Sequence, residues 1–342
     1  MPHIVHAPHL NRNIVLGGRK RPKHPAHAVK LRNILRTAID LPATTNRRAK
    51  ADKSLREMFL NDTLGDCVIA GRGHRIGELT GFSTGSPFVY SKDQILTEYE
   101  RIGGYDPKDP STDQGCDMTV AANDGVQVGY ADGSKDVGWV SINAADKNEV
   151  MTAIYLFEVG DLGTSLPDAW ISPFPSADGF KWDVAGKPND ENGHCYQIVD
   201  YDTDGVWIDT WGLYGKQTWK ALAKYNIDSA GGEFLVHLNQ DQLVAAIQKS
   251  PDGVAWGDLI AAFNAMGGNV QPIVNPPAPP APPGPTPVPA PPAPSPEPSS
   301  SGPTLSDALG YLDREFKHAR RVMNKDVALK TAQNALAKHW PQ

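Results

Sequence analysis

Hydrophobic and polar positions follow two different periods along the chain. In residues 67–79 and 147–156, apolar side chains recur three and four positions apart, which predicts two amphipathic helices. From His194 onward, apolar and aromatic residues form short runs typical of strands. Asp204-Gly205 separates two such runs and indicates a β-hairpin. The pattern therefore predicts a body of mixed α and β structure.

A different pattern governs the C-terminal part of the chain. Of the 23 residues from Pro276 to Pro298, 14 are proline, which favours an extended polyproline spacer. A heptad stripe on one helix face follows: Leu305, Leu309, Leu312, Phe316, Ala319 and Met323. A module this short cannot bury a stable core alone. We therefore expect the stripe to meet a partner helix, a second copy or the body.

These changes of pattern divide the 342 residues into four parts. We expect a basic N-terminal arm over residues 1–54 and a folded body over residues 55–268. A proline-rich linker over residues 269–303 then leads to an amphipathic helical module over residues 304–342. A polyproline spacer keeps two modules apart, so the terminal module is expected to tether the protein, through self-association or a partner protein.

The net charge of −6 conceals an uneven distribution. Residues 1–60 hold 13 Lys and Arg against 3 Asp and Glu, whereas residues 61–302 hold 13 against 32. A basic arm beside an acidic body indicates either contact with nucleic acid or an arm that wraps its own chain. We favour the second interpretation, because no nucleic-acid-binding motif accompanies the charge.

Composition also restricts location and cofactors. No run of about 18 apolar residues could form a transmembrane helix, and the N-terminus lacks the pattern of a signal peptide. Three cysteines cannot form a disulfide framework, which favours a reducing compartment. We expect a cytoplasmic protein without membrane contact, or a virion-associated one if a phage encodes it. Cys67, Cys195 and His194 lack the paired short spacing of zinc ligands, so no metal or other cofactor is expected.

Four residues combine into candidate catalytic chemistry. Cys67 follows a Gly-Asp turn at a predicted helix start, where the helix dipole favours a thiolate and lowers the thiol pKa. His194 can supply an imidazolium to pair with that thiolate. Asp209 follows 15 residues later across the hairpin and can orient the imidazole ring. Asn61, six residues before Cys67, can direct its amide at a developing oxyanion.

Each of these residues also has a structural interpretation. A lone cysteine is usually a small buried hydrophobe, and a histidine on a strand is usually part of a core. Cys116 is a rival nucleophile because it ends a Gln-Gly-Cys sequence, but only 78 residues separate it from His194 and no apolar helix follows it. Cys195 lies within a predicted strand and is expected in the core.

The order and spacing of the candidates resemble the papain-like cysteine peptidases, and bacterial and phage members in particular. Cys67 and His194 are 127 residues apart, close to the family's separation of about 130–150. The resemblance covers roughly residues 55–240. Its motifs are the loop of residues 61–67 before the nucleophile, the substrate strand of residues 113–118, the histidine strand of residues 193–202, and residues 208–212, similar to an Asn-Ser-Trp-Gly segment.

The resemblance implies an α+β, papain-like fold, with a helical half that carries the nucleophile and an antiparallel β half. It implies hydrolysis of peptide bonds through a thioester acyl-enzyme, with Cys67 as nucleophile, His194 as base, Asp209 as third triad member and Asn61 as oxyanion donor. The substrate is then a peptide or protein.

The resemblance also implies a set of substrate-binding residues. Backbone groups near Gly115 would hold an extended peptide, with Gln114 and Gly65 beside it. Trp211 would shield the hydrogen bond between Asp209 and His194.

Several positions depart from the family pattern. Asn61 replaces the usual glutamine, Asp209 replaces the usual asparagine, and Leu64 stands where a cysteine often pairs with the equivalent of Cys116. Two alternatives therefore remain. One is acyl transfer of the transglutaminase or amidase type on the same fold, and the other is a catalytically weak or inert structural or adaptor protein, possibly phage-associated.

Overall fold

The computed structural model describes residues 2–7, 11–20, 29–265, 268 and 270. Apart from Val270, the predicted linker and helical module lie outside the described residues, so these two parts of the division stay predictions. Among the residues described, no helix is both long and apolar enough to cross a membrane.

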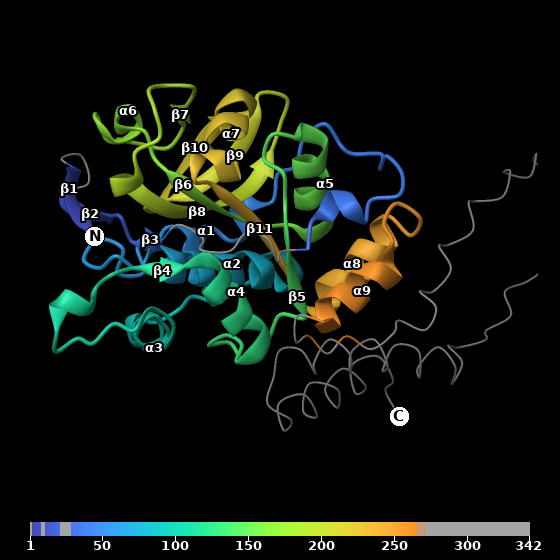
Figure 1. Ribbon diagram of the computed structural model, residues 1–342, viewed down its shortest axis with the longest axis horizontal. Coiled ribbons are helices and arrows are strands. Elements are labelled where there is room, and N and C mark those ends of the chain that lie inside the picture. Colours follow the sequence, from blue (N-terminus) through green and yellow to red (C-terminus); the bar gives the residue numbers. More distant parts are fainter. Residues whose placement is uncertain (1, 8–10, 21–28, 266–267, 269, 271–342) are drawn as a thin grey trace, which may run out of the picture. The chain divides into compact units, whose positions relative to one another are not determined.

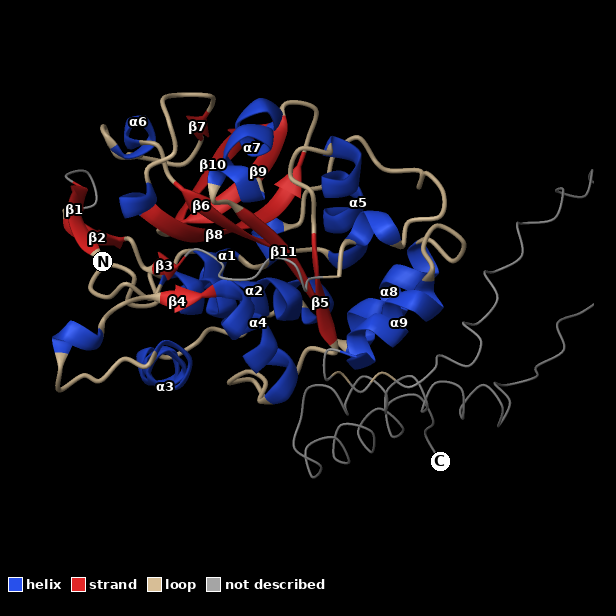
Figure 2. Cartoon of the chain, viewed as in Figure 1, coloured by secondary structure: helices blue, strands red, loops and turns tan. Residues whose placement is uncertain are grey.

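A seven-stranded sheet forms one half of the described fold (Figures 1 and 2). Its order is β5-β11-β6-β8-β9-β10-β7, and every neighbouring pair is antiparallel except β10 and β7, which run parallel. The strands are β5 (Gly138–Ser141), β6 (Gly160–Ser165), β7 (Phe180–Trp182), β8 (Gly193–Tyr201), β9 (Gly205–Thr210), β10 (Leu213–Thr218) and β11 (Glu233–Leu238).

Helices cover both faces of this sheet, and α2, α3 and α4 gather on one side of it (Figure 1). The helices are α1 (Asp52–Leu55), α2 (Cys67–Thr84), α3 (Lys92–Gly103), α4 (Met118–Gln127), α5 (Lys147–Phe157), α6 (Asp168–Ile171), α7 (Trp219–Tyr225), α8 (Gln240–Lys249) and α9 (Trp256–Ala265). The α+β class predicted from the sequence, with a helical half and a largely antiparallel β half, is confirmed.

Successive residues of the central strands contribute side chains to two separate hydrophobic cores. On β8, Tyr196 and Ile198 belong to the core that also contains α5, whereas Cys195 belongs to the core around α2. On β11, Phe234 and Leu235 divide in the same way. Successive side chains of a strand point to opposite faces, so the sheet separates the two cores and β8, buried at all nine residues, lies between them.

The predicted helices and hairpin are confirmed at their expected places. α2 begins at Cys67, and its four expected apolar residues are buried: Val68, Ile69, Ile76 and Leu79. α5 begins behind Asp146, whose carboxylate accepts hydrogen bonds from the N–H groups of Asn148 and Glu149. β8 and β9 form the hairpin around the turn that contains Asp204.

Glycine and charged residues of α2 are buried as well as its apolar residues. Gly71 allows it to approach β8 closely, because a Cβ at this position would lie 2.4 Å from Gln197 Nε2. The charged residues of α2 are buried too. Arg72 donates to carboxylates of α3 and α4, namely Glu98 Oε2 (2.8 Å) and Asp124 Oδ1 (3.0 Å). Such pairing offsets the cost of removing the guanidinium from water.

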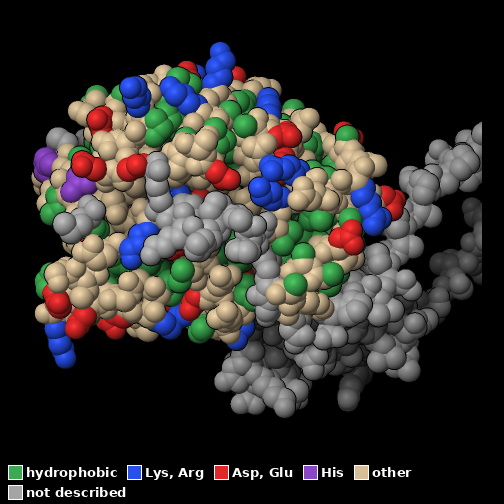
Figure 3. All heavy atoms as spheres, viewed as in Figure 1, with side chains coloured by type: hydrophobic (Ala, Val, Ile, Leu, Met, Phe, Trp, Pro, Cys, Tyr) green, Lys and Arg blue, Asp and Glu red, His purple; other side chains and the backbone are tan. Residues whose placement is uncertain are grey.

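The described residues of the first 54 pack closely on the body. β1 (His3–Ala7) and β2 (Arg12–Leu16) form an antiparallel hairpin, and Leu16 and Leu31 join the larger core. Arg48 Nη1 lies 3.1 Å from Asp200 Oδ2. Basic residues of this stretch therefore meet carboxylates of their own chain. On the face drawn in Figure 3, the described basic and acidic side chains are interspersed.

Candidate active site

All four predicted catalytic residues line one narrow internal cavity. Cys67 and Asn61 border it from the helical half, and His194 and Asp209 border it from the sheet. Its volume of about 10 Å³ leaves room for roughly one water molecule. The remaining lining residues are Met58, Ala70, Gly71, His74, Cys195, Gln197, Thr210 and Trp211.

Cys67 is the first residue of α2, and Asp66 is the residue before the helix. The thiol is only 2% exposed, and burial raises its pKa to about 12. The Asp66 carboxylate raises the pKa further, while Arg19 and the Cys195 backbone N–H oppose the shift. The predicted lowering of the thiol pKa is therefore wrong, because desolvation of the thiolate outweighs the effect of the helix N-terminus.

His194 is a buried, neutral imidazole. Its Nε2 lies 2.8 Å from Thr210 Oγ1, and its Nδ1 has no hydrogen-bond partner among the described residues. Burial lowers its pKa to about 3, with a smaller contribution from His74. The Trp211 ring stacks on it at a centroid distance of 4.5 Å and an interplanar angle of 18°. The resemblance implies that Trp211 shields a hydrogen bond between Asp209 and His194, but among the described residues Asp209 makes no such bond.

We expect alkylation of Cys67 by iodoacetamide to accelerate about tenfold per pH unit between about pH 6 and 8, because a neutral thiol forms its thiolate in proportion to hydroxide. Mass spectrometry of the peptide that contains Cys67 measures the rate, and the Cys67→Ala chain reports labelling of the other two cysteines. A rate that stays flat over this range would reveal a preformed thiolate–imidazolium pair and contradict the neutral state.

Asp209 does not make the expected hydrogen bond to His194. Neither carboxylate oxygen has a hydrogen-bond partner within the described part of the chain, and the nearest ionisable contact is His74 Nδ1, 3.6 Å away. The reason is strand register. Asp209 is paired with Gln197, so both face α2, whereas His194 and Thr210 share the opposite face. Thr210 therefore supplies the contact that was assigned to Asp209.

The Asn61 amide is directed at its own loop. Its Nδ2 lies 3.4 Å from Leu64 O and 3.5 Å from Asp66 Oδ1, which are long, weak hydrogen bonds. Burial raises the pKa of Asp66 well above its usual range. Asn61 thus borders the cavity while its N–H groups are only weakly engaged, which leaves them available to a stronger acceptor.

The predicted substrate-binding residues separate into two groups. Gly65 and Gly115 both lie against Gly18, since a Cβ on Gly18 would be 2.2 Å from Gly65 O and a Cβ on Gly115 would be 1.9 Å from Gly18 O. Gln114 instead is part of the neighbouring loop, where its Nε2 donates to Ser111 O (2.7 Å). Gly115 has a φ of +73°, a conformation that favours glycine.

The backbone of residues 17–20 makes hydrogen bonds with segments of the body next to His194 and Gly115. The Gly17 N–H donates to Gly193 O (2.9 Å), and Gly18 O accepts from the Cys116 N–H (2.8 Å). The next two residues form β3 (Arg19–Lys20), which runs parallel to β4 (Cys116–Asp117). No sequence pattern predicted this contact. Its local signal is the Gly17-Gly18 pair, because paired glycines permit close backbone approach.

The other two cysteines are less suited to nucleophilic attack. Cys116 lies in β4 and does not line the cavity, and burial raises its pKa. Cys195 faces α2, where a Cβ on Gly71 would be 3.4 Å from its sulfur, and burial raises its pKa well above the ordinary value. The described residues hold no group of three or more His, Cys, Asp or Glu side chains arranged to bind a metal.

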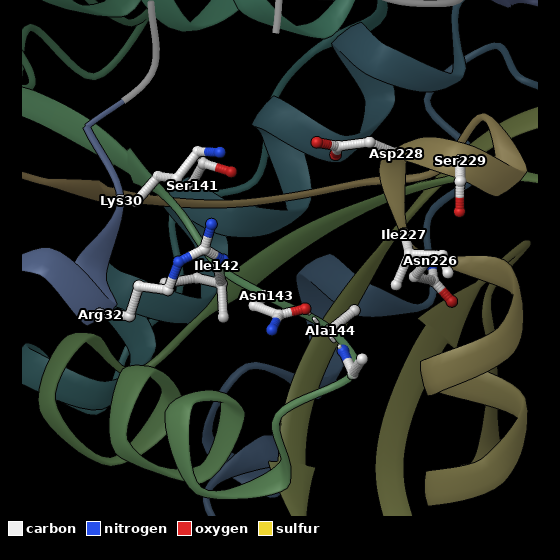
Figure 4. Close-up of a pocket in the computed structure, with 11 residues that line it drawn as sticks. Lys30, Arg32, Ser141, Ile142, Asn143, Ala144, Asn226, Ile227, Asp228 and Ser229 are labelled. Carbon is white, nitrogen blue, oxygen red and sulfur yellow. Dashed lines mark hydrogen bonds between the residues drawn. The ribbon is translucent and has the colours of Figure 1, made fainter. Parts of the chain in front are cut away.

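Larger pockets lie away from Cys67. Figure 4 shows one of about 340 Å³, with Lys30 and Arg32 at one side and Asp228 at the other. Another, of about 750 Å³, lies between β1 and the segment before β8, and includes His3 and Asn192. None of the four candidate catalytic residues lines either pocket.

Comparisons with known proteins found similarity among solved structures only. No protein-family model matches the sequence, and no curated protein matches it. A cysteine protease from Xylella fastidiosa, xylellain, is 14% identical, with 66% of this chain and 96% of that chain covered at a TM-score of 0.48.

A Carica candamarcensis cysteine protease in complex with E-64 is 13% identical, with 58% of this chain and 99% of that chain covered at a TM-score of 0.41. Procathepsin L2 from the larval midgut of Tenebrio molitor is 15% identical, with 66% of this chain and 78% of that chain covered at a TM-score of 0.43. At these identities and TM-scores the likeness assigns this chain neither a family nor an activity.

Proposed function

We propose that this chain is a cysteine peptidase that hydrolyses peptide bonds by nucleophilic attack of Cys67, with His194 as general base. The observation that carries the proposal is the single cavity that joins Cys67, at the start of a helix, to His194, stacked under Trp211. Cys116 does not line this cavity, and Cys195, which does line it, lies within β8 rather than at the start of a helix.

The reaction would proceed by acyl transfer. His194 removes the thiol proton as Cys67 sulfur attacks the peptide carbonyl. The resulting oxyanion is stabilised by hydrogen-bond donors, for which Asn61 Nδ2, in the lining of the same cavity, is a side-chain candidate. Collapse of the tetrahedral intermediate breaks the C–N bond, and the imidazolium protonates the departing amine. Water, activated by the neutral His194, then hydrolyses the thioester and regenerates the thiol.

The segment at Gly17 and Gly18 supports a peptide as the substrate class. Its backbone makes hydrogen bonds with backbone groups of Gly193 and Cys116, which shows that these groups can hold a peptide backbone. Incubation of the full chain with fluorogenic peptides tests the proposal, with mass spectrometry to trap an acyl adduct on Cys67. Transfer of that acyl group to an added amine in preference to water would indicate a transferase instead.

Thr210 is proposed as the positioning residue for His194. We expect Thr210→Val to lower kcat on the order of 10-fold to 100-fold with little change in KM, because the imidazole loses the hydrogen bond that orients it. Thr210→Ser keeps the hydroxyl and should restore most of the activity. If Asp209→Asn causes the larger loss and Thr210→Val causes none, the working enzyme uses Asp209 as the orienting residue.

A second candidate, an inert structural or adaptor protein, is favoured by one observation. The thiol and imidazole are both buried and neutral, with pKa values of about 12 and about 3. In that case Cys67 would resist an iodoacetamide-type probe at neutral pH, even in a Gly18→Ala chain, where the added Cβ would lie 2.2 Å from Gly65 O and displace the N-terminal segment. Rapid and selective labelling of such a variant would favour the peptidase.

A further inference from the structure

Two carboxyl groups lie buried between α2 and the sheet without a hydrogen-bond partner. Glu78 belongs to α2 and Asp209 to β9, and both residues are 0% exposed. Among the described residues, no oxygen of either carboxyl group has a hydrogen-bond partner. An ionised carboxylate is very costly to remove from water unless a cation or hydrogen-bond donors compensate its charge. Each group therefore requires either a nearby cation or a bound proton.

The charged surroundings of Glu78 are mostly negative. Burial raises its pKa well above the usual range, and three acidic residues of the sheet raise it further: Asp209, Asp161 and Asp200. Arg47 opposes this shift, but its Nη2 donates to two backbone carbonyl groups at the end of α5, at 2.8 and 3.3 Å. A carboxylate at Glu78 would therefore add a further negative charge to an acidic cluster, whereas a protonated Glu78 would not.

Two members of this acidic cluster have basic partners of their own. Asp161 Oδ2 lies 3.4 Å from Arg75 Nε and 3.2 Å from His237 Nε2. Although burial alone would raise it, these partners hold the pKa of Asp161 below its ordinary value. Asp200 Oδ2 lies 3.1 Å from Arg48 Nη1. Asp161 and Asp200 can thus stay ionised, and their charges disfavour another carboxylate beside them.

His74, one helical turn before Glu78, does not supply a positive charge. Its Nδ1 lies 3.2 Å from Ser54 O and 3.6 Å from Asp209 Oδ2. A carbonyl oxygen only accepts hydrogen bonds, so Nδ1 carries a hydrogen and donates it to Ser54. Burial lowers the pKa of His74 to about 4. The imidazole is therefore neutral at pH 7 and leaves Asp209 without a counter-ion on this side.

On its other side, Asp209 faces charged groups that already pair with one another. Burial raises the pKa of Asp209 well above its usual range, and Arg56 opposes the shift. The Arg56 guanidinium, however, binds Asp178 (2.7 Å) and Asp52 (3.1 Å), whose charges raise the pKa of Asp209 further. The nearby Tyr214 hydroxyl also donates to Asp52 (3.0 Å). A bound proton is thus the simplest means of keeping Asp209 buried.

We propose that Glu78 and Asp209 keep their protons in the folded protein at neutral pH, and that together they form a pH-sensitive contact between α2 and the sheet. Loss of either proton places an uncompensated negative charge in this interface. The helix that begins at Cys67 then separates more readily from β8 and β9, so the contact weakens as the pH rises. This property goes beyond the proposed peptidase function and does not depend on it.

The proton balance gives the direction and size of the effect. In the unfolded chain both carboxyls ionise near an ordinary pKa of about 4, whereas the folded protein holds their protons to higher pH. Their stabilising effect is therefore complete below about pH 4 and is lost as the pH rises toward the pKa of the folded state. Each retained proton makes the opening equilibrium rise about tenfold per pH unit. Buried neutral His74 and His194 act in the opposite direction below about pH 6.5, so variants are needed to isolate the two acids.

Hydrogen exchange of the full chain tests this contact. Glu78→Gln and Asp209→Asn imitate the protonated acids but have no proton to lose, so both chains should fold. We expect the equilibrium constant for opening of α2 in the parent, relative to either variant, to rise about tenfold per pH unit from about pH 5 to 7. Mass spectrometry of peptides from residues 72–82 measures the exchange, after correction for the pH dependence of intrinsic amide exchange.

Glu100→Gln is the matched control, because it removes an exposed carboxylate from α3, and it should open with the pH dependence of the parent. Infrared difference spectra at pH 7 give a second measurement, in which each of the two buried-acid variants should lose a carbonyl band of a protonated carboxyl. The proposal is overturned if either variant opens with the pH dependence of the parent, or if the carbonyl band is unchanged in either one.

Discussion

Replacing Cys67 by alanine is expected to lower peptide hydrolysis by on the order of 10⁴-fold or more, because the thioester route is lost and only binding and oxyanion stabilisation remain. The fold should survive, since alanine fills most of the space of the small buried thiol. Hydrolysis is measured by fluorophore release, and folding is measured by urea unfolding of the same preparations.

Cys116→Ala is the matched control, because this cysteine is equally buried but lies in β4, outside the cavity. It should retain activity within a few-fold of the parent. Full activity in the Cys67→Ala chain, together with its loss in the Cys116→Ala chain, would exchange the two assignments. Loss of activity in both variants would indicate that the two substitutions act by destabilising the fold.

Arg72→Ala should destabilise the fold by about 3–5 kcal/mol, because it leaves two carboxylates without their buried cation. Arg72 is 2% exposed in its side chain, Glu98 is 6% exposed and Asp124 is 13% exposed. Arg72 also donates to the carbonyl of Ala121, so it joins α2 to both α3 and α4. The free energy of unfolding is measured by urea denaturation.

Arg101→Ala provides the control, because Arg101 binds the same Asp124 from a side chain that is 34% exposed. Water screens this pair, so the loss should stay within about 1 kcal/mol. Arg72→Met retains the apolar stem and separates packing from charge. If Arg72→Ala and Arg101→Ala cost the same, the buried network does not hold the helical half together.

Local patterns predicted the elements that position the site. The start of α2 at Cys67 follows from the apolar spacing of residues 67–79, and the β8–β9 hairpin follows from Asp204-Gly205 between two apolar runs. These signals suffice because helix periodicity and turn preference depend on residues close in sequence. The buried charges of α2 had no such signal, since Arg72 finds its partners 26 and 52 residues away.

Motif order and spacing in the sequence predicted Cys67, His194, Asp209 and Asn61 as partners in one site, and all four line the same cavity. Their contacts within that cavity depend on the packing of the strands and helices. The register of β8 and β9 places Asp209 on the face opposite His194, so Thr210 makes the hydrogen bond to the imidazole. Burial keeps the Cys67 thiol neutral, although its position at a helix start predicted a thiolate. The cost of burying a charged group, and the face of the sheet on which a side chain lies, both depend on residues that are distant in sequence. Local residue spacing therefore cannot predict either of them.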